Sequence, residues 1–225
     1  MNIIARIHTD LPTKFGLPRQ SGLVDELEGL IIFEPEYRSA EALRGIEGFS
    51  HLWLIWEFSE AVRDSWSPTV RPPRLGGNKR MGVFATRSPF RPNPFGLSCV
   101  RLVGIEKTPN SGLAIRVSGI DLMDGTPILD IKPYLPSADC HPEATGGFAK
   151  EVEGYHLEVE FPQELLLKVP EGKRKALISL LSQDPRPSYQ NDPDRIYGFG
   201  YAGMEVRFRV DDGVLYVTDT QDIGK

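Results

Sequence analysis

Arg87 and Arg91 lie in a proline-rich run that is suited to bind an anion. Residues 85–96 read ATRSPFRPNPFG, with three prolines around the two arginines. Proline fixes φ, removes a hydrogen-bond donor and favours extended geometry in the residue before it, so this run is predicted to be a stiff loop. A stiff loop loses little entropy when it orders around an anionic ligand. We interpret the run as part of a site rather than of the core.

A second polar run could serve proton chemistry or bind a polar ligand through Asp121, Asp124, Asp130, Lys132 and Tyr134. Asp124 begins the turn sequence Asp-Gly-Thr-Pro, and the plainer interpretation is a turn that joins two strands. The last three polar residues are spaced two apart, which places them on one side of an extended segment. That arrangement favours a functional site.

Basic residues concentrate between positions 63 and 101, although the net charge of the chain is −5. This segment carries eight Lys and Arg residues against Asp64 alone. Such a segment fits a phosphate-binding footprint. The alternative is that these cations pair with acidic residues elsewhere in an acidic protein, and the sequence leaves both possibilities open.

Length, composition and residue spacing argue against several classes of protein. The 225 residues suffice for one large or two small domains. No stretch approaches the ~18 apolar residues of a membrane span, and no signal peptide is recognisable. Cys99 and Cys140 form no disulfide framework, and the four histidines share no ligand spacing, so no metal site is expected. We expect a cytoplasmic protein.

The elements that must position these residues are mostly strands. Residues 109–112 are predicted to form a hairpin turn, and only residues 39–45 have helix character in the first half. Long loops are expected at 11–22 and 59–80, and such loops are often functional. The pattern indicates a small antiparallel β barrel or a sandwich. Runs of branched and aromatic residues predict strands at 2–8, 29–33, 50–58, 81–86, 98–105 and 112–120.

The second part of the chain has a different pattern. Residues 136–147 have a linker composition, and Asp184, Arg186 and Tyr189 crowd a proline-rich loop that suits a nucleotide base, or that simply ends the preceding helix. We infer a mainly β chain, with a barrel over residues 1–140 and a small α+β domain over 141–225. The signals predict strands at 155–161, 204–210 and 214–219, a helix at 170–183 and a hairpin turn at 211–213.

These runs together resemble the TsaA-like family, also called TrmO. The resemblance is carried by residues 18–24, 66–78, 82–94 and 124–134, and by 184–187, which is similar to the extra domain of bacterial members. It implies a small β barrel, unlike Rossmann-type methyltransferases, that works as a homodimer with its cofactor near the subunit interface. The implied reaction is S-adenosylmethionine-dependent methylation of tRNA at N6 of threonylcarbamoyl-adenosine 37.

The resemblance also implies roles for individual residues. A His is familiar where this chain has Ser59. The substrate contacts are our own hypothesis from residue type and position, and we assign them to Arg91, Asp184, Arg186 and Tyr189. Cofactor contacts carry over to Pro18, Arg19, Gln20, Ser59, Glu60, Arg87, Leu97, Asp124, Gly125, Thr126 and Pro127.

Chemistry constrains the remaining roles. The threonylcarbamoyl group delocalises the N6 lone pair, so transfer needs in-line placement and an acceptor for the proton. We hypothesise that Asp130 or Tyr134 takes that proton and that Asn93 and Lys132 orient the acceptor. The two polar runs are expected to converge at a barrel mouth shared between subunits.

Two alternatives remain open at the sequence level. One is a non-catalytic tRNA-binding module, supported only by Ser59. The other is a methyltransferase of another modified nucleoside or of a small molecule.

Overall fold

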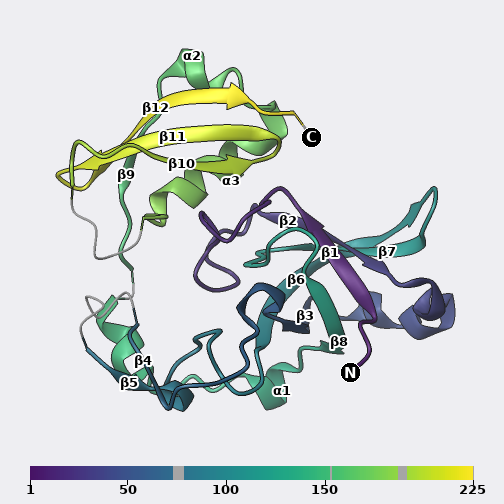
Figure 1. Ribbon diagram of the computed structural model, residues 1–225. Helices are drawn as coiled ribbons and strands as arrows, with labels where there is room; N and C mark the ends of the chain where they lie inside the picture. Colours follow the sequence, from purple (N-terminus) through teal and green to yellow (C-terminus); the bar gives the residue numbers. More distant parts are fainter. Residues whose placement is uncertain (73–78, 153, 187–191, 225) are drawn as a thin grey trace.

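A computed structural model describes residues 1–72, 79–152, 154–186 and 192–224 (Figure 1). Two sheets dominate it, a six-stranded one in the first part of the chain and a four-stranded one near the C-terminus. The prediction of a mainly β chain is confirmed. Within the described ranges, no helix is long and apolar enough to span a bilayer.

The six-stranded sheet closes on itself. The strand order is β1-β2-β7-β6-β3-β8, each neighbouring pair is antiparallel, and β1 also pairs with β8. Alternate residues point inward, as on β3, where Leu52, Leu54 and Trp56 are buried. The strands are β1 (Ala5–Thr9), β2 (Glu28–Phe33), β3 (His51–Glu57), β6 (Phe95–Thr108), β7 (Gly112–Ser118) and β8 (Pro127–Pro133).

Two predicted elements of this part are wrong. Within 81–86 only β5 (Met81–Gly82) is a strand, paired with β4 (Thr69–Val70), and Val83–Ala85 turns into a 3-10 helix. The residue types at 81–86 favour a strand, but the partner strand β4 is only two residues long, so the pairing stops at Gly82. The predicted helix at 39–45 is a 3-10 turn over Ala40–Leu43, which ends before the left-handed Gly45.

The predicted loop at 59–80 contains short elements of its own. Ser59–Ala61 forms a 3-10 turn and β4 follows it. We call residues 59–72 and 79–94 the basic arm. In Figure 1 this arm extends away from the barrel, with β4 and β5 at its far end.

The C-terminal unit has the predicted α+β content of one main helix on a sheet of order β10-β11-β12-β9. The turn at Asp212 and Gly213 has positive φ at both residues, as its hairpin sequence predicts. Its helix buries the predicted apolar face, whereas β10, α2 and α1, inside the expected linker, were not predicted. The elements of this unit are β9 (Glu158–Glu160), α2 (Gln163–Leu166), α3 (Glu171–Ser182), β10 (Tyr197–Tyr201), β11 (Met204–Asp211) and β12 (Val214–Asp222). The short helix α1 (Pro136–Asp139) lies beside the barrel, where Asp139 accepts a hydrogen bond from Trp53 of β3.

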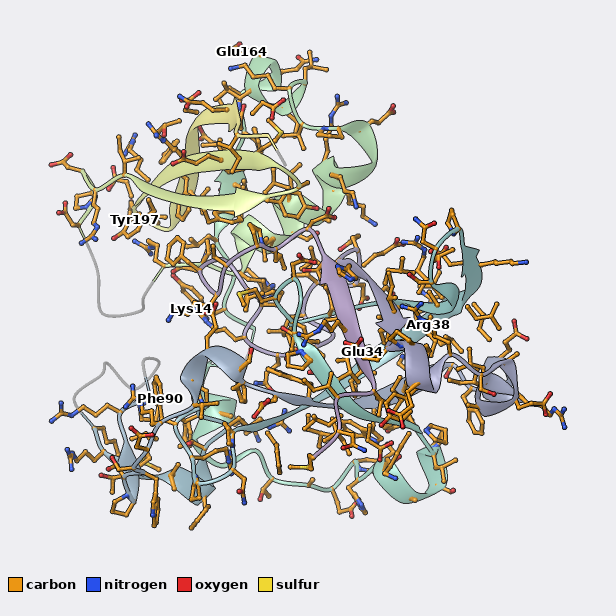
Figure 2. All side chains as sticks on the ribbon, turned by 45° about the vertical axis from the view of Figure 1, so that its right-hand side comes forward. Lys14, Glu34, Arg38, Phe90, Glu164 and Tyr197 are labelled. Carbon is orange, nitrogen blue, oxygen red and sulfur yellow. The ribbon has the colours of Figure 1, made fainter. Side chains whose placement is uncertain are left out.

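The loop at 11–22 joins the two units. The ring of Phe15 packs edge-on against Phe199 of β10, with centroids 6.5 Å apart. Lys173 of α3 bonds to Asp10 at 2.5 Å. Figure 2 shows Lys14 of this loop between Tyr197 of the C-terminal sheet and Phe90 of the basic arm. The loop therefore sets how the arm and the C-terminal unit face each other.

Candidate functional site

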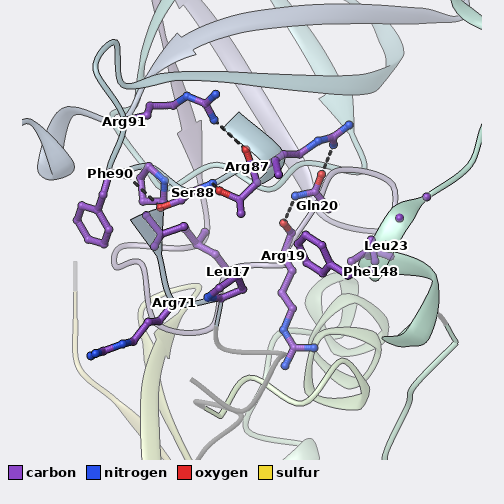
Figure 3. Close-up of a pocket in the computed structure, with 18 of the residues that line it drawn as sticks. Leu17, Arg19, Gln20, Leu23, Arg71, Arg87, Ser88, Phe90, Arg91 and Phe148 are labelled. Atoms are coloured by element: carbon purple, nitrogen blue, oxygen red, sulfur yellow. Dashed lines mark hydrogen bonds between the residues drawn. The ribbon is translucent and has the colours of Figure 1, made fainter. Parts of the chain in front are cut away.

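A cleft of about 2020 Å³ lies between the basic arm, the 14–20 loop and the C-terminal unit. Figure 3 shows several of its side chains. Aromatic rings from the arm and from both flanking segments also line it. Seven arginines contribute to its lining: Arg19, Arg63, Arg71, Arg80, Arg87, Arg91 and Arg186.

Three predicted cofactor residues meet in this cleft. The guanidinium of Arg87 donates to Oε1 of Gln20, and Nε2 of Gln20 donates to the carbonyl of Arg19 at 2.5 Å (Figure 3). Arg19 reaches across to donate to the Asp184 carbonyl at 2.9 Å. Pro18 is buried beside them and fixes the start of this turn. The contacts connect the loop, the arm and the C-terminal unit.

The arginines of the basic arm have no carboxylate partners. Among the described residues, none of Arg63, Arg71, Arg80, Arg87 and Arg91 forms an ion pair. Within the described ranges the structure therefore gives these five arginines no salt bridge to an acidic residue, although the charge of Arg87 acts on the buried carboxylate of Asp121. Their charge is therefore available to an anionic ligand.

Asp184 and Arg186 pair with each other instead. Nε and Nη2 of Arg186 donate to the two carboxylate oxygens at 2.8 and 3.0 Å, and both side chains are less than a tenth exposed. Tyr155 donates to the same carboxylate at 3.3 Å, and burial followed by the Asp184 charge raises the pKa of Tyr155. This pair shapes the cleft wall without adding net charge. Tyr189 lies outside the described residues.

A buried carboxylate lies behind the Gln20–Arg87 contact. Ser98 donates to Asp121 at 2.6 Å and accepts from Nε1 of Trp56 at 2.9 Å. Burial raises the pKa of Asp121, while bonds from Ser98 and from the Ser21 backbone, and the charge of Arg87, oppose the rise. The sequence singled out Asp121 only as one polar residue among several, because its partners lie on distant strands.

The turn at Asp124–Pro127 is bound to β1 rather than to the cleft. Asp124 accepts from the Thr9 amide at 3.0 Å, and Arg6 donates to the Gly125 carbonyl at 3.1 Å. Thr126 is buried. None of the four turn residues lines the cleft. Arg87 therefore lines this cleft and Asp124 does not, so within one chain the two polar runs do not converge on it.

The proposed proton-handling residues lie on the outer face of the barrel. Asp130 and Lys132 form an ion pair of 3.1 Å on β8, opposite Ile55 and Trp53 of β3. Tyr134 packs its ring 5.8 Å from that of Trp53. These three residues share one side, as predicted, but none lines the cleft.

The remaining predicted residues are spread around these two groups. Leu97 is on β6 and is 54% exposed, Asn93 is exposed in the arm, and Ser59 and Glu60 are exposed in the 3-10 turn. Arg91 lines the cleft and donates to the Thr86 carbonyl at 3.1 Å. We call Arg19, Gln20, Arg87 and Arg91 the cleft group. The turn at Asp124–Pro127 together with Asp130, Lys132 and Tyr134 forms the barrel-face group.

Comparison with known proteins identifies relatives over the whole chain. Residues 6–140 match the tRNA-methyltransferase O N-terminal domain, and residues 155–223 match the TrmO C-terminal domain. The chain is 42% identical over 219 residues to an Escherichia coli (strain K12) protein named tRNA (adenine(37)-N6)-methyltransferase, which covers 93% of this chain and 92% of that protein. An Eikenella corrodens protein of the same name is 46% identical over 75% of this chain and 95% of its own length.

The fold is also that of a solved relative. The crystal structure of TrmO from Pseudomonas aeruginosa superimposes with a TM-score of 0.78 at 33% identity, over 97% of this chain and 96% of that one. Both the sequence and the fold therefore agree over nearly the full length. This chain belongs to the tRNA-methyltransferase O family.

Proposed function

We propose that this chain methylates N6 of threonylcarbamoyl-adenosine at position 37 of tRNA, with S-adenosylmethionine as the methyl donor. Family membership and the names of the E. coli and Eikenella corrodens relatives support a tRNA adenine-37 N6-methyltransferase. The structural observation that carries the proposal is the joining of Arg19, Gln20 and Arg87 in a cleft rich in unpaired arginines.

The donor set of the cleft fits the proposed cofactor. The guanidinium of Arg87 suits the carboxylate of its amino-acid end, and the amide of Gln20 can both donate and accept. Leu23 and Phe148 line the cleft near Gln20 and offer apolar surface to an adenine ring (Figure 3). When bound, S-adenosylmethionine supplies an electrophilic methyl group on its sulfonium.

The chain's own residues must then bind the tRNA and remove the proton of N6. The unpaired arginines of the basic arm suit phosphates of the anticodon loop. Asp130 and Tyr134 remain the proposed proton acceptors, with Asn93 and Lys132 as orienting groups. Since Asp130 and Tyr134 lie on the barrel face, they would act on a nucleotide held against that face.

A homodimer would reconcile the two groups of residues. The cleft group and the group at 124–134 do not meet within one chain, so we propose that one subunit's cleft faces the other's barrel face. Exposed Leu97 and Leu135 near β8 and β6 supply apolar surface for such a contact. We also propose that residues 1–140 form the methyltransferase domain and 141–225 an accessory tRNA-binding domain, in keeping with the two family matches.

The test is methyl transfer to two tRNAs that differ only in the threonylcarbamoyl group of adenosine 37. Mass spectrometry of the products is expected to find the new methyl only on the threonylcarbamoylated tRNA. Asp130→Asn is expected to slow transfer by about 100-fold or more while cofactor affinity, measured by titration calorimetry, is retained. Asp212→Asn, in the β11–β12 turn, is the matched control. Equal methylation of both tRNAs would refute the proposed substrate.

A further inference from the structure

Two large aromatic side chains are exposed side by side on the basic arm. Trp66 is 52% and Phe84 74% exposed, and their ring centroids lie 6.0 Å apart with 33° between the ring planes. Both rings line the cleft. Large apolar side chains are usually buried, so an exposed pair at a cleft edge indicates a binding surface.

The arm holds this pair in place. Trp66 comes shortly before β4 and Phe84 shortly after β5, and the two strands pair through Thr69–Gly82 and Val70–Met81. The Val83 amide donates to the Pro68 carbonyl at 3.0 Å. The two rings therefore flank a hydrogen-bonded pair of strands and do not lie on unconnected segments.

Cations line the same cleft as the pair. Arg63 lies 3.7 Å from the ring centroid of Phe90, and Arg80 donates to the Thr69 hydroxyl at 3.1 Å. Arg71 lines the same cleft and, within the described ranges, has no ion-pair partner. Aromatic faces combined with unpaired cations are the features of surfaces that bind single-stranded nucleic acid.

We propose that Trp66 and Phe84 form a stacking platform for an unpaired base that flanks the methylated adenosine in the anticodon loop. The inference rests on the proposed function. The two rings are already at the separation of an aromatic pair, so a base stacks on an outer ring face rather than between them. The platform offers no proton acceptor, because the indole N–H only donates. It positions a neighbouring nucleotide and leaves the target base to the reacting groups.

The test is binding of an anticodon stem-loop RNA, monitored by tryptophan fluorescence and by anisotropy of labelled RNA. Trp66 is the exposed tryptophan, since Trp56 is buried and Trp53 is half-buried on β3. RNA is expected to quench the fluorescence of the wild type. Trp66→Phe is expected to lose the part of that quenching that comes from Trp66 and to keep its affinity, whereas Trp66→Ala and Phe84→Ala bind about 10-fold more weakly.

Leu167→Ala is the matched control, because Leu167 is 61% exposed in the C-terminal unit and does not line the cleft. It is expected to bind RNA as the wild type does. Unchanged RNA affinity of both alanine variants would overturn the platform, as would quenching in Trp66→Phe that is as strong as in the wild type. A shift in oligomeric state without a change in RNA affinity would assign the rings to self-association and overturn it as well.

The two proposals fail in different ways. If the wild type transfers no methyl group but the stem-loop still quenches Trp66, the proposed reaction fails and the platform stands. If methyl transfer occurs and the alanine variants bind and react normally, the platform alone fails.

Discussion

The carboxylate of Asp121 holds three segments of the site together. It accepts from Ser98 on β6 and from the backbone of Ser21, and it lies within electrostatic reach of Arg87 on the basic arm. Ser21 in turn accepts from the Cys99 amide at 3.1 Å. Because the Gln20–Arg87 contact adjoins this network, Asp121 is a positioning residue for the cleft rather than a group that reaches it.

Replacing Asp121 with Asn is expected to change how stability depends on pH. Burial raises the pKa of Asp121 in the folded state, so the folded chain holds this proton more tightly than the unfolded one. Its contribution to stability is therefore largest below the ordinary value of 3.8 and declines as pH rises from there through the higher folded pKa. The free energy of unfolding of the wild type minus that of Asp121→Asn is expected to fall across this window and then level off.

Urea unfolding of both proteins at a series of pH values measures that difference. Asp64→Asn, which removes an exposed carboxylate, controls for the general effect of charge. A difference that is constant with pH would contradict the buried-carboxylate account.

Gly16 shows what the loop at 11–22 requires as an element. Its φ of +93° is left-handed, and a Cβ there would lie 2.6 Å from the ring of Phe199. Gly22 in the same loop also has positive φ, +76°, but has no atoms within 4 Å of such a Cβ. A Cβ would meet an unfavourable backbone conformation at both glycines but a steric clash only at Gly16, so comparing the two substitutions isolates the effect of the clash.

Gly16→Ala is expected to destabilise the protein by about 1–3 kcal/mol more than Gly22→Ala, because only the first forces Phe199 to move. Thermal unfolding of the two variants measures the comparison. Since Arg19 and Gln20 follow in the same loop, Gly16→Ala is also expected to weaken cofactor binding. Equal destabilisation by the two variants would mean that the loop is not held against β10.

The sequence predicted correctly those elements that are determined by neighbouring residues, such as turn sequences and apolar periodicity. The β11–β12 hairpin, the β6–β7 hairpin and α3 follow directly from turn residues and from apolar periodicity. β10 was missed because its sequence, Tyr-Gly-Phe-Gly-Tyr, places two glycines in a strand. The strand predicted at 81–86 was too long because residue preferences do not report the length of the partner strand.

The candidate site was predicted as residue types but not as an arrangement. The Arg87–Gln20 contact joins residues 67 positions apart, and no periodicity indicates it. The same limit explains why the sequence offered Asp121 only as one of several residues for proton chemistry or ligand binding, without its partners. The exposure of Trp66 and Phe84 likewise depends on the β4–β5 pairing, which local sequence did not predict.

On the scale of the whole molecule, the predicted cofactor residues lie in two separate places. Arg19, Gln20 and Arg87 are joined in the cleft, while Asp124 is fixed on β1 by the Thr9 amide. In the proposed homodimer, the second subunit would bring both groups to one cofactor site. In a twofold-symmetric dimer each site would take one group from each chain, which gives two equivalent shared sites.

Mixed dimers of two inactive variants test this division. Arg87→Gln removes the cation from the cleft, and Asp124→Asn removes the charge while keeping an acceptor for the Thr9 amide. Each variant alone is expected to lose most methyl transfer. In a dimer that contains one of each, one site carries both changes and the other carries neither. A random mixture is therefore expected to regain about a quarter of the wild-type activity.

The matched control mixes Arg87→Gln with Gln20→Ala, two changes in the same group. Every site in those dimers retains one change, so activity should not return. Recovery confined to the first mixture would assign the two groups to different subunits of one site. If neither mixture recovers while both form dimers, the site shared between subunits is refuted. Asp124 would then serve β1 and the barrel rather than the reaction.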